Sequence, residues 1–242
     1  MVGFIVCSGG EIMKVLILAA GYATRLYPLT LDTPKPLLDV GGKLMIDHIL
    51  DRINVIDEFI DDVYVVTNEK FFGQFKEWAE KSVFDVTIVN DGTKTNEDRL
   101  GAIGDIDFVI KEKGIDDDLM VIAGDNLFEF DLKSFYDYFW EIERSVVGIY
   151  DLKDKSKLAN KYGVVELNEE GRIIGFEEKP AEPKTSLTST ACYIFSKEDV
   201  ARLENCIAEN EIPDNLGDFI RWLSEKGEVY GFVFSEDWFD IG

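Results

Sequence analysis

The sequence predicts an α/β fold with a Rossmann-like, mostly parallel sheet flanked by helices and an antiparallel insertion in the second half. Apolar runs of strand length alternate with segments of helical periodicity up to residue 150, which is typical of βαβ units. After residue 160 the apolar runs follow one another across short turns, which indicates antiparallel pairing. The chain has 242 residues, 46% of them hydrophobic, so it has enough apolar material for one large core.

The first predicted strand is the run KVLILA at residues 14–19, which is apolar throughout after its lysine, as in a parallel strand covered on both faces. Asn168-Glu169-Glu170-Gly171 separates two later runs and predicts a hairpin-like turn. In chain order, the other strands are expected at 63–67, 86–89, 119–123, 146–150, 162–167, 172–177, 191–195 and 228–234.

The first predicted helix is recognised by apolar residues at helical spacing, namely Ile46, Ile49, Leu50, Ile53 and Ile56. The one histidine of the chain, His48, lies in this helix, and we expect it to have a structural role. A single histidine also argues against a histidine-based zinc site. Further helices are expected at 71–80, 100–113, 132–142, 197–209 and 215–226.

Charge and cysteine content limit the partners and the compartment. With 25 basic and 48 acidic residues, the net charge of −23 is expected to repel nucleic acid and anionic membranes. No apolar run approaches the roughly 20 residues of a membrane-spanning helix. The odd number of cysteines (Cys7, Cys192 and Cys206) and the missing signal-peptide pattern predict a cytoplasmic protein.

The loop after the first strand combines the features of a phosphate-binding site. Residues 19–21 are small enough to let a ligand approach the backbone, and Arg25 and Lys35 supply cations in an acidic chain. Three prolines between residues 28 and 36 restrict the loop. Open α/β sheets bind ligands at the carboxyl ends of their strands, where this loop is expected. Neither a Walker loop nor a dinucleotide glycine pattern is present.

The sequence LAAGYATRLYPLT at 18–30, followed by PKPLL at 34–38, resembles the signature of the sugar-phosphate nucleotidyltransferases. The resemblance continues through later motifs and covers nearly everything after Met13. It implies transfer of a nucleoside monophosphate from an NTP to a sugar 1-phosphate, with Mg²⁺ as cofactor, and it assigns catalysis to Arg25, Lys35 and Asp125. The nucleotide-binding residues that it implies in this region are Leu18, Ala19, Ala20, Gly21, Thr24, Arg25 and Lys35.

Two further segments resemble the metal-binding motifs of the family. The sequence Gly124-Asp125-Asn126 follows a predicted strand, and 238–242 resembles the family's W-x-D-x-G segment. The resemblance implies that Asp125 and Asp240 hold Mg²⁺. Relatives usually continue after the position of Gly242 with Thr-Pro and helices, so the family's C-terminal oligomer contacts, and a homo-oligomer, are left open.

The sugar-phosphate subsite is implied by the segments YGVV at 162–165 and FEEKP at 176–180. They assign Gly163, Glu178, Lys179 and Thr190 to sugar-phosphate binding, and Ala191 stands where relatives have glycine. Residues 1–12 are interpreted as an N-terminal extension, and 13–242 as a single domain. Within that domain, about 13–145 would bind the nucleotide and about 146–242 the sugar phosphate.

The base-reading segment departs most from the family. Many relatives have a glutamine followed by L-G-T-A-G-A, whereas this chain has L-G-A-I-G-D at residues 100–105. Gly101 matches the base-contacting glycine, and Asn90 or Asn96 could replace the glutamine, which favours a pyrimidine NTP. Two alternatives stay open: a cytidylyltransferase for inositol, glycerol or choline phosphate, and a non-catalytic regulator that binds a nucleotide sugar. Pyrophosphate release would separate an enzyme from a regulator.

Overall fold

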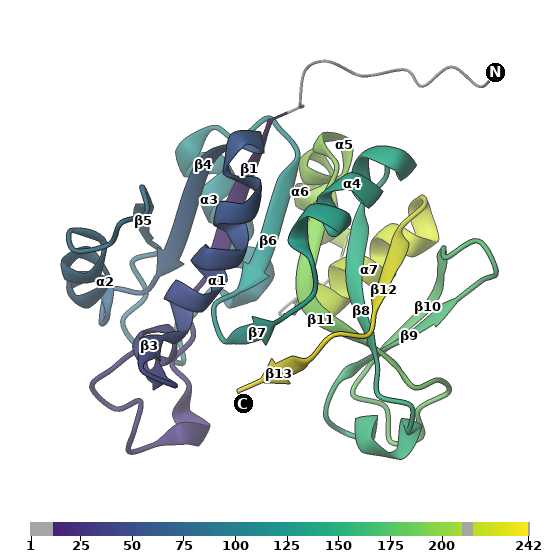
Figure 1. The fold of residues 1–242 in the computed structure, drawn as a ribbon, viewed down its shortest axis with the longest axis horizontal. Helices are drawn as coiled ribbons and strands as arrows, with labels where there is room; N and C mark the ends of the chain where they lie inside the picture. Colours follow the sequence, from purple (N-terminus) through teal and green to yellow (C-terminus); the bar gives the residue numbers. More distant parts are fainter. Residues whose placement is uncertain (1–11, 210–214, 242) are drawn as a thin grey trace.

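Helices and strands alternate in the first half of the chain, and strands follow one another more directly in the second half (Figure 1). The structure, a computed structural model, describes residues 12–209 and 215–241. In chain order its elements are β1 (Met13–Leu18), β2 (Asp39–Val40), β3 (Lys43–Leu44), α1 (Met45–Ile53), β4 (Ile60–Thr67), α2 (Phe72–Ala79), β5 (Thr87–Asn90), α3 (Gly101–Lys113), β6 (Leu119–Ala123), β7 (Asn126–Phe128), α4 (Leu132–Ile142), β8 (Val146–Asp151), β9 (Gly163–Leu167), β10 (Ile173–Glu178), β11 (Leu187–Phe195), α5 (Lys197–Ala201), α6 (Leu203–Glu209), α7 (Leu216–Lys226), β12 (Tyr230–Phe234) and β13 (Trp238–Asp240).

The main sheet has the strand order β10-β9-β11-β6-β1-β4-β5, and β8 and β12 extend from β11. Strands β6, β1, β4 and β5 pair in parallel, which puts their carboxyl ends at one edge. Strand β11 runs antiparallel to β6 and leads into the antiparallel β9–β10 hairpin. The α/β fold with an antiparallel insertion is therefore confirmed.

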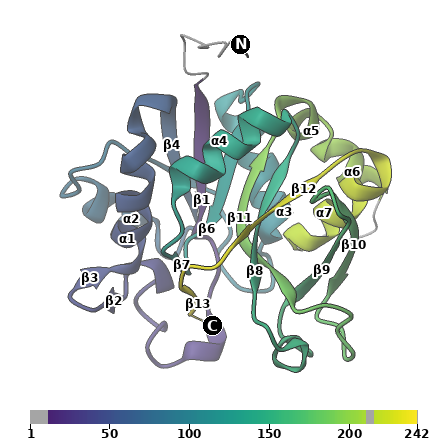
Figure 2. The same ribbon diagram turned by 45° about the vertical axis from the view of Figure 1, so that its right-hand side comes forward.

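Helices cover both faces of the sheet (Figures 1 and 2). Successive residues of a strand point to opposite faces, so Val15 and Ile17 of β1 pack in one core cluster and Leu16 in the other. The first cluster includes apolar side chains of α1, α2 and α4, and the second includes those of α3, α6 and α7. Near-continuous apolar strands are thus buried on both sides, as the sequence predicts.

The elements differ from the predictions at several places, of which three bear on the topology. The predicted helix 197–209 is interrupted at Arg202 and forms α5 and α6. Strand β11 begins at Leu187 rather than 191, because it continues past a bulge to pair with β8. The two-stranded sheet of β7 and β13 was not predicted. Within the described parts of the chain, no helix is long and apolar enough to cross a membrane.

Candidate active site

A pocket of about 730 Å³ lies at the carboxyl ends of β1 and β6, between the parallel part of the sheet and the antiparallel insertion. The loop after β1 contributes one wall, and the ends of β9, β10 and β13 contribute the opposite one. The pocket is lined by all but one of the residues that the sequence assigns to the site, namely Leu18, Ala19, Ala20, Gly21, Thr24, Arg25, Lys35, Asn96, Gly101, Asp125, Gly163, Glu178, Lys179, Thr190 and Asp240.

The exception is Asn90, at the end of β5. Its Nδ2 donates a hydrogen bond to Glu69 Oε2 at 2.5 Å, and its Oδ1 accepts one from the Gly92 N–H at 2.9 Å. Its amide therefore stabilises the turn after β5, whereas Asn96 does line the pocket. Of the two asparagines considered for base reading, only Asn96 is placed where it could contact a ligand.

A partly buried ion pair connects the phosphate-binding loop to the end of β6. Lys35 lies in a 3-10 helix, Lys35–Leu37, and its Nζ donates to Asp125 Oδ2 at 2.7 Å. Only 7% of Lys35 is exposed. Gly124 allows the 3-10 helix to lie close to the end of β6, because a Cβ there would lie 3.0 Å from Pro36 Cγ. The pair brings a cation and a carboxylate from distant segments to one side of the pocket.

The second carboxylate, Asp240, is brought beside Asp125 by the β7–β13 pairing, in which Asp240 lies opposite Asn126. Burial raises the pKa of Asp240 and the charge of Asp125 raises it further, whereas Lys35, Lys179 and Arg25 lower it. Asp125, Lys35, Lys179 and Arg25 therefore all lie close enough to Asp240 to act on its carboxylate. This arrangement of three basic and two acidic side chains is suited to a phosphorylated ligand with a bound metal cation.

Asn126 stabilises this arrangement, although no separate role was predicted for it. Its Oδ1 accepts a hydrogen bond from Trp238 Nε1 at 2.5 Å, and its Nδ2 donates to the Thr190 carbonyl oxygen. The side chain thereby connects β7, β13 and β11. The signal available in the sequence was its place after Asp125 in the G-D-N motif.

The donor set fits Mg²⁺. This ion takes oxygen ligands and usually keeps several waters, with one or two protein carboxylates and substrate phosphates completing the shell. Asp125 and Asp240 supply two carboxylates to the same pocket. Among the described residues there is no group of three acidic, histidine or cysteine side chains that could hold a metal by itself. A metal here would therefore depend on the substrate for further ligands.

At the sugar-phosphate end of the pocket, Gly163 is tightly packed against Phe176. A Cβ on Gly163 would lie 2.5 Å from Phe176 Cζ, so only glycine fits there while Phe176 keeps its position. Lys179 is half-exposed, and its Nζ lies 3.1 Å from Glu178 Oε1. Thr190 is fully buried, and its hydroxyl donates to the Gly148 carbonyl oxygen at 2.9 Å. The Thr190 side chain thus ties β11 to β8.

Ala191 explains the bulge in β11. Its φ of 55° is left-handed, and the β11–β8 register shifts between Ser189 and Tyr193. Left-handed backbone is costly for any residue with a Cβ, so the glycine of relatives is expected at this position on physical grounds.

We expect Ala191→Gly to raise the free energy of unfolding by about 0.5–1 kcal/mol, because relief of left-handed strain outweighs the added freedom of the unfolded chain. Ala191→Val should lower it, since a β-branched side chain tolerates this conformation least. Urea unfolding monitored by circular dichroism measures both. A destabilised glycine variant would contradict the strained geometry.

Comparison with known proteins decides the family. Residues 14–242 match the sequence profile described as nucleotidyl transferase. The chain belongs to the nucleotidyl transferase family. This confirms the resemblance found in the sequence.

Among its relatives, this nucleotidyl transferase is 29% identical to the bifunctional protein GlmU of Methanocaldococcus jannaschii, over 95% of this chain and 51% of GlmU. It is 28% identical to the glucose-1-phosphate adenylyltransferase of Aliivibrio fischeri (strain MJ11), over 94% of this chain and 62% of that enzyme. The chain therefore spans about half the length of the GlmU relatives that it matches.

Solved structures share the fold. A protein from Bacillus anthracis, assigned as a glucose-1-phosphate thymidylyltransferase and solved with sucrose, superposes with a TM-score of 0.79 at 26% identity, covering 94% of this chain and 89% of that one. A UDP-glucose pyrophosphorylase in complex with UDP-glucose superposes with a TM-score of 0.76 at 22% identity, covering 95% and 93%. The second similarity shows the fold alone.

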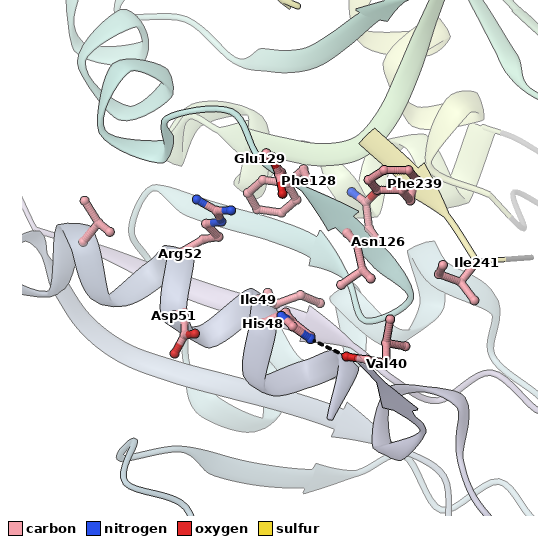
Figure 3. Close-up of a pocket in the computed structure, with 12 residues that line it drawn as sticks. Val40, His48, Ile49, Asp51, Arg52, Asn126, Phe128, Glu129, Phe239 and Ile241 are labelled. Atoms are coloured by element: carbon pink, nitrogen blue, oxygen red, sulfur yellow. Dashed lines mark hydrogen bonds between the residues drawn. The ribbon is translucent and has the colours of Figure 1, made fainter. Parts of the chain in front are cut away.

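A second pocket of this nucleotidyl transferase, of about 610 Å³, lies between α1 and the β7–β13 pair (Figure 3). Asn126 lines both pockets, so the two short strands separate them. A ring N–H of His48 donates to the Val40 carbonyl oxygen at 2.9 Å, which anchors β2 to α1. The structural role expected for His48 agrees with this contact.

Proposed function

We propose that this protein transfers a nucleoside monophosphate from an NTP to a sugar 1-phosphate and releases pyrophosphate. The observation that carries the proposal is the single pocket in which Arg25, Lys35 and Lys179 surround the Asp125–Asp240 pair. Such a pocket can hold two phosphorylated substrates, because the cations and a metal between the carboxylates would offset their negative charge.

In the proposed reaction a phosphate oxygen of the sugar 1-phosphate attacks the α-phosphorus of the NTP in line. A new P–O bond forms, and the bond from the α-phosphorus to the oxygen that bridges to the β-phosphorus breaks with its electrons, giving pyrophosphate. The substrate supplies the nucleophile, so the protein contributes positioning and charge stabilisation. Bound Mg²⁺ would supply Lewis-acid stabilisation of the phosphate oxygens, held by Asp125 and Asp240.

The two ends of the pocket are proposed to have separate tasks. Arg25 follows the loop of small residues after β1 and would contact the triphosphate. Lys35, already beside Asp125, would offset the charge of the leaving pyrophosphate. Lys179 directly follows β10 on the opposite wall and would orient the attacking phosphate.

Arg25→Ala is expected to raise KM for the NTP, and Lys179→Ala to raise KM for the sugar phosphate. Each loses one charge-assisted hydrogen bond, which is worth about tenfold or more in affinity. Steady-state kinetics with one substrate varied at a time measures the two effects. A loss of affinity for the same substrate in both variants would contradict this division of the pocket.

The reaction itself is tested by pyrophosphate release from a panel of NTPs with hexose 1-phosphates and with inositol, glycerol and choline phosphates. Release that depends on a hexose 1-phosphate supports the proposal, and release that depends only on a phospho-alcohol supports the alternative cytidylyltransferase. A cytoplasmic location without nucleic-acid partners remains a prediction from the cysteine content and the net charge of −23. The homo-oligomer left open by the sequence requires a direct measurement of mass in solution.

A further inference from the structure

A lysine-rich loop borders the sugar-phosphate end of the active-site pocket. We call residues 152–161, between β8 and β9, the basic loop, because they include four lysines and one aspartate. Their net charge is thus +3, whereas that of the whole chain is −23. The basic loop extends beyond the sheet at the same end as the loop after β1 (Figures 1 and 2), and its last residue, Lys161, lines the pocket. A positive segment therefore lies at the site in a chain whose overall charge repels anions.

Hydrogen bonds and one buried side chain hold the basic loop in place. Leu158 is fully buried and anchors its middle. The Asn160 N–H donates to the Pro180 carbonyl oxygen at 2.9 Å, which ties the loop to the segment after β10. Close by, the Lys179 N–H donates to the Tyr162 carbonyl oxygen at 3.1 Å. The basic loop is therefore fixed beside Lys179, the residue proposed to orient the attacking phosphate.

The one carboxylate of the basic loop caps a helix and forms no ion pair with the lysines around it. Asp154 Oδ1 accepts hydrogen bonds from the Ser156 N–H at 3.0 Å and from the Ser156 hydroxyl at 2.6 Å, at the start of the 3-10 helix Lys155–Leu158. The first lysine of the loop, Lys153, pairs with Asp151 at the end of β8. The other three lysines are left to face solvent and the pocket.

These three lysines, Lys155, Lys157 and Lys161, are exposed, and no carboxylate in the part of the chain that the structure describes forms an ion pair with them. The adjoining Lys179 and Lys184 are each paired with a glutamate. With 48 acidic residues in the chain against 25 basic ones, three unpaired lysines within seven positions are contrary to the overall composition. Their charges are available to a ligand.

The phosphorylated acceptor complements this surface. A phosphate monoester carries a charge of about −1.5 to −2 near pH 7. A positively charged cleft concentrates such a ligand and raises its rate of association by about 10- to 1000-fold, an effect that salt weakens. The basic loop adjoins Lys179, on the wall opposite the loop that contains Arg25. We therefore expect its field to act on the sugar phosphate more than on the NTP.

We propose that the basic loop is the capture surface for the phosphorylated acceptor, and that Lys161 contacts the acceptor phosphate beside Lys179. The inference rests on the proposed nucleotidyl transfer and deepens it. It adds Lys161 to the acceptor-binding residues, and it assigns the entry of the acceptor to the side of the pocket formed by the antiparallel insertion.

The first test compares two triple variants that lower the net charge equally. The basic-loop variant carries Lys155→Gln, Lys157→Gln and Lys161→Gln. The control variant changes three other exposed lysines, which do not line the active-site pocket, by Lys76→Gln, Lys81→Gln and Lys113→Gln. Each is assayed by pyrophosphate release, with the NTP and sugar 1-phosphate that the unmodified protein uses best, at two ionic strengths.

At an ionic strength of about 0.01 M, where charges act over about 30 Å, the basic-loop variant should have a kcat/KM for the sugar phosphate about tenfold lower than the unmodified protein. At about 1 M, where that range is about 3 Å, most of the difference should disappear. We expect kcat and the KM for the NTP to stay unchanged, and the control variant to match the unmodified protein. An unchanged kcat/KM for the sugar phosphate at low salt, or an equal loss for the NTP or in the control variant, would overturn the proposal.

Single variants test the contact made by Lys161. Lys161→Gln should raise the KM for the sugar phosphate about two- to fivefold, as expected for the loss of an exposed charge pair, and leave kcat unchanged. Lys161→Arg keeps the charge and should keep the KM of the unmodified protein. An equal rise of KM in both variants would show that Lys161 only supports the loop, and no rise in Lys161→Gln would exclude the contact.

Calorimetry with glucose 1-phosphate at low ionic strength separates this inference from the proposed reaction, because it requires no turnover. If no NTP and acceptor release pyrophosphate, but the basic-loop variant binds glucose 1-phosphate about tenfold more weakly than the control variant, the reaction is wrong and the capture surface stands. If turnover occurs and the two variants have equal kinetics and equal binding, the reaction stands and the capture surface is wrong. Absence of binding and of turnover in the unmodified protein would contradict both.

Discussion

Asp125→Asn is expected to lower kcat by about a hundredfold or more, because stabilisation of phosphate charge by a metal is worth several kcal/mol and each 1.36 kcal/mol is about tenfold. The Asp125 carboxylate lies 2.7 Å from the Lys35 ammonium group. Its charge also raises the pKa of the second carboxylate, Asp240. Asparagine has nearly the same shape and can still accept a hydrogen bond from Lys35, so the fold should survive. Steady-state kinetics at saturating Mg²⁺ measures the loss.

Two further variants, Asp240→Asn and Asp137→Asn, test whether the loss of kcat is specific to the proposed metal site. Asp240→Asn should behave similarly, since Asp240 lies close enough to Asp125 for the Asp125 charge to raise its pKa. Asp137→Asn removes an exposed carboxylate that pairs with Lys133 at 2.5 Å on α4, and it should leave kcat unchanged. EDTA should abolish turnover of the unmodified protein, and added Mg²⁺ should restore it. Nearly normal kcat in folded Asp125→Asn would contradict a metal site of two carboxylates.

Lys35→Met should reduce kcat by about a hundred- to a thousandfold, the usual cost of removing one preorganised electrostatic group at a reacting phosphate or carbonyl. Lys35 is almost completely buried and its Nζ is held by Asp125, so the ammonium group is in place before substrates bind. Methionine fills the same space without the charge. Single-turnover kinetics with both substrates saturating separates this loss from a change in binding.

The control for this variant is Lys43→Met, which removes a lysine that pairs with Asp51 away from the active-site pocket. Lys43→Met should retain full activity. Lys35→Met should also bind NTP with only moderately lower affinity, because Arg25 and the metal still contact the phosphates. If Lys35→Met lost affinity but kept its kcat, Lys35 would be a binding residue without a role in the transition state.

The fold and most of the candidate site could be predicted from local sequence signals. The parallel strands are short apolar runs, and the loop that contains Gly21, Arg25 and Lys35 directly follows the first of them. In a parallel sheet, such loops meet at one edge, which is why Lys35, after β1, and Asp125, after β6, line one pocket.

The remaining features depend on long-range contacts. Strands β7 and β13 are three residues each and are separated by more than 100 positions, so their pairing has no local signal. The position of Asn90 could not be distinguished from that of Asn96 by residue type, because both are amides close to Gly101 in sequence. Asp105 is visible in the sequence as a departure from the L-G-T-A-G-A pattern, whereas its burial is seen only in the structure.

Following the α-phosphate of the NTP tests the proposed transfer most directly. NTP labelled at the α-phosphorus is incubated with a sugar 1-phosphate and Mg²⁺, and the products are separated and counted. We predict that the label appears in a nucleoside diphosphate sugar, in equal amount to the released pyrophosphate, and only when the sugar phosphate is present. Label recovered as free nucleoside monophosphate, or left in unreacted NTP with every sugar phosphate supplied, would contradict the proposed reaction.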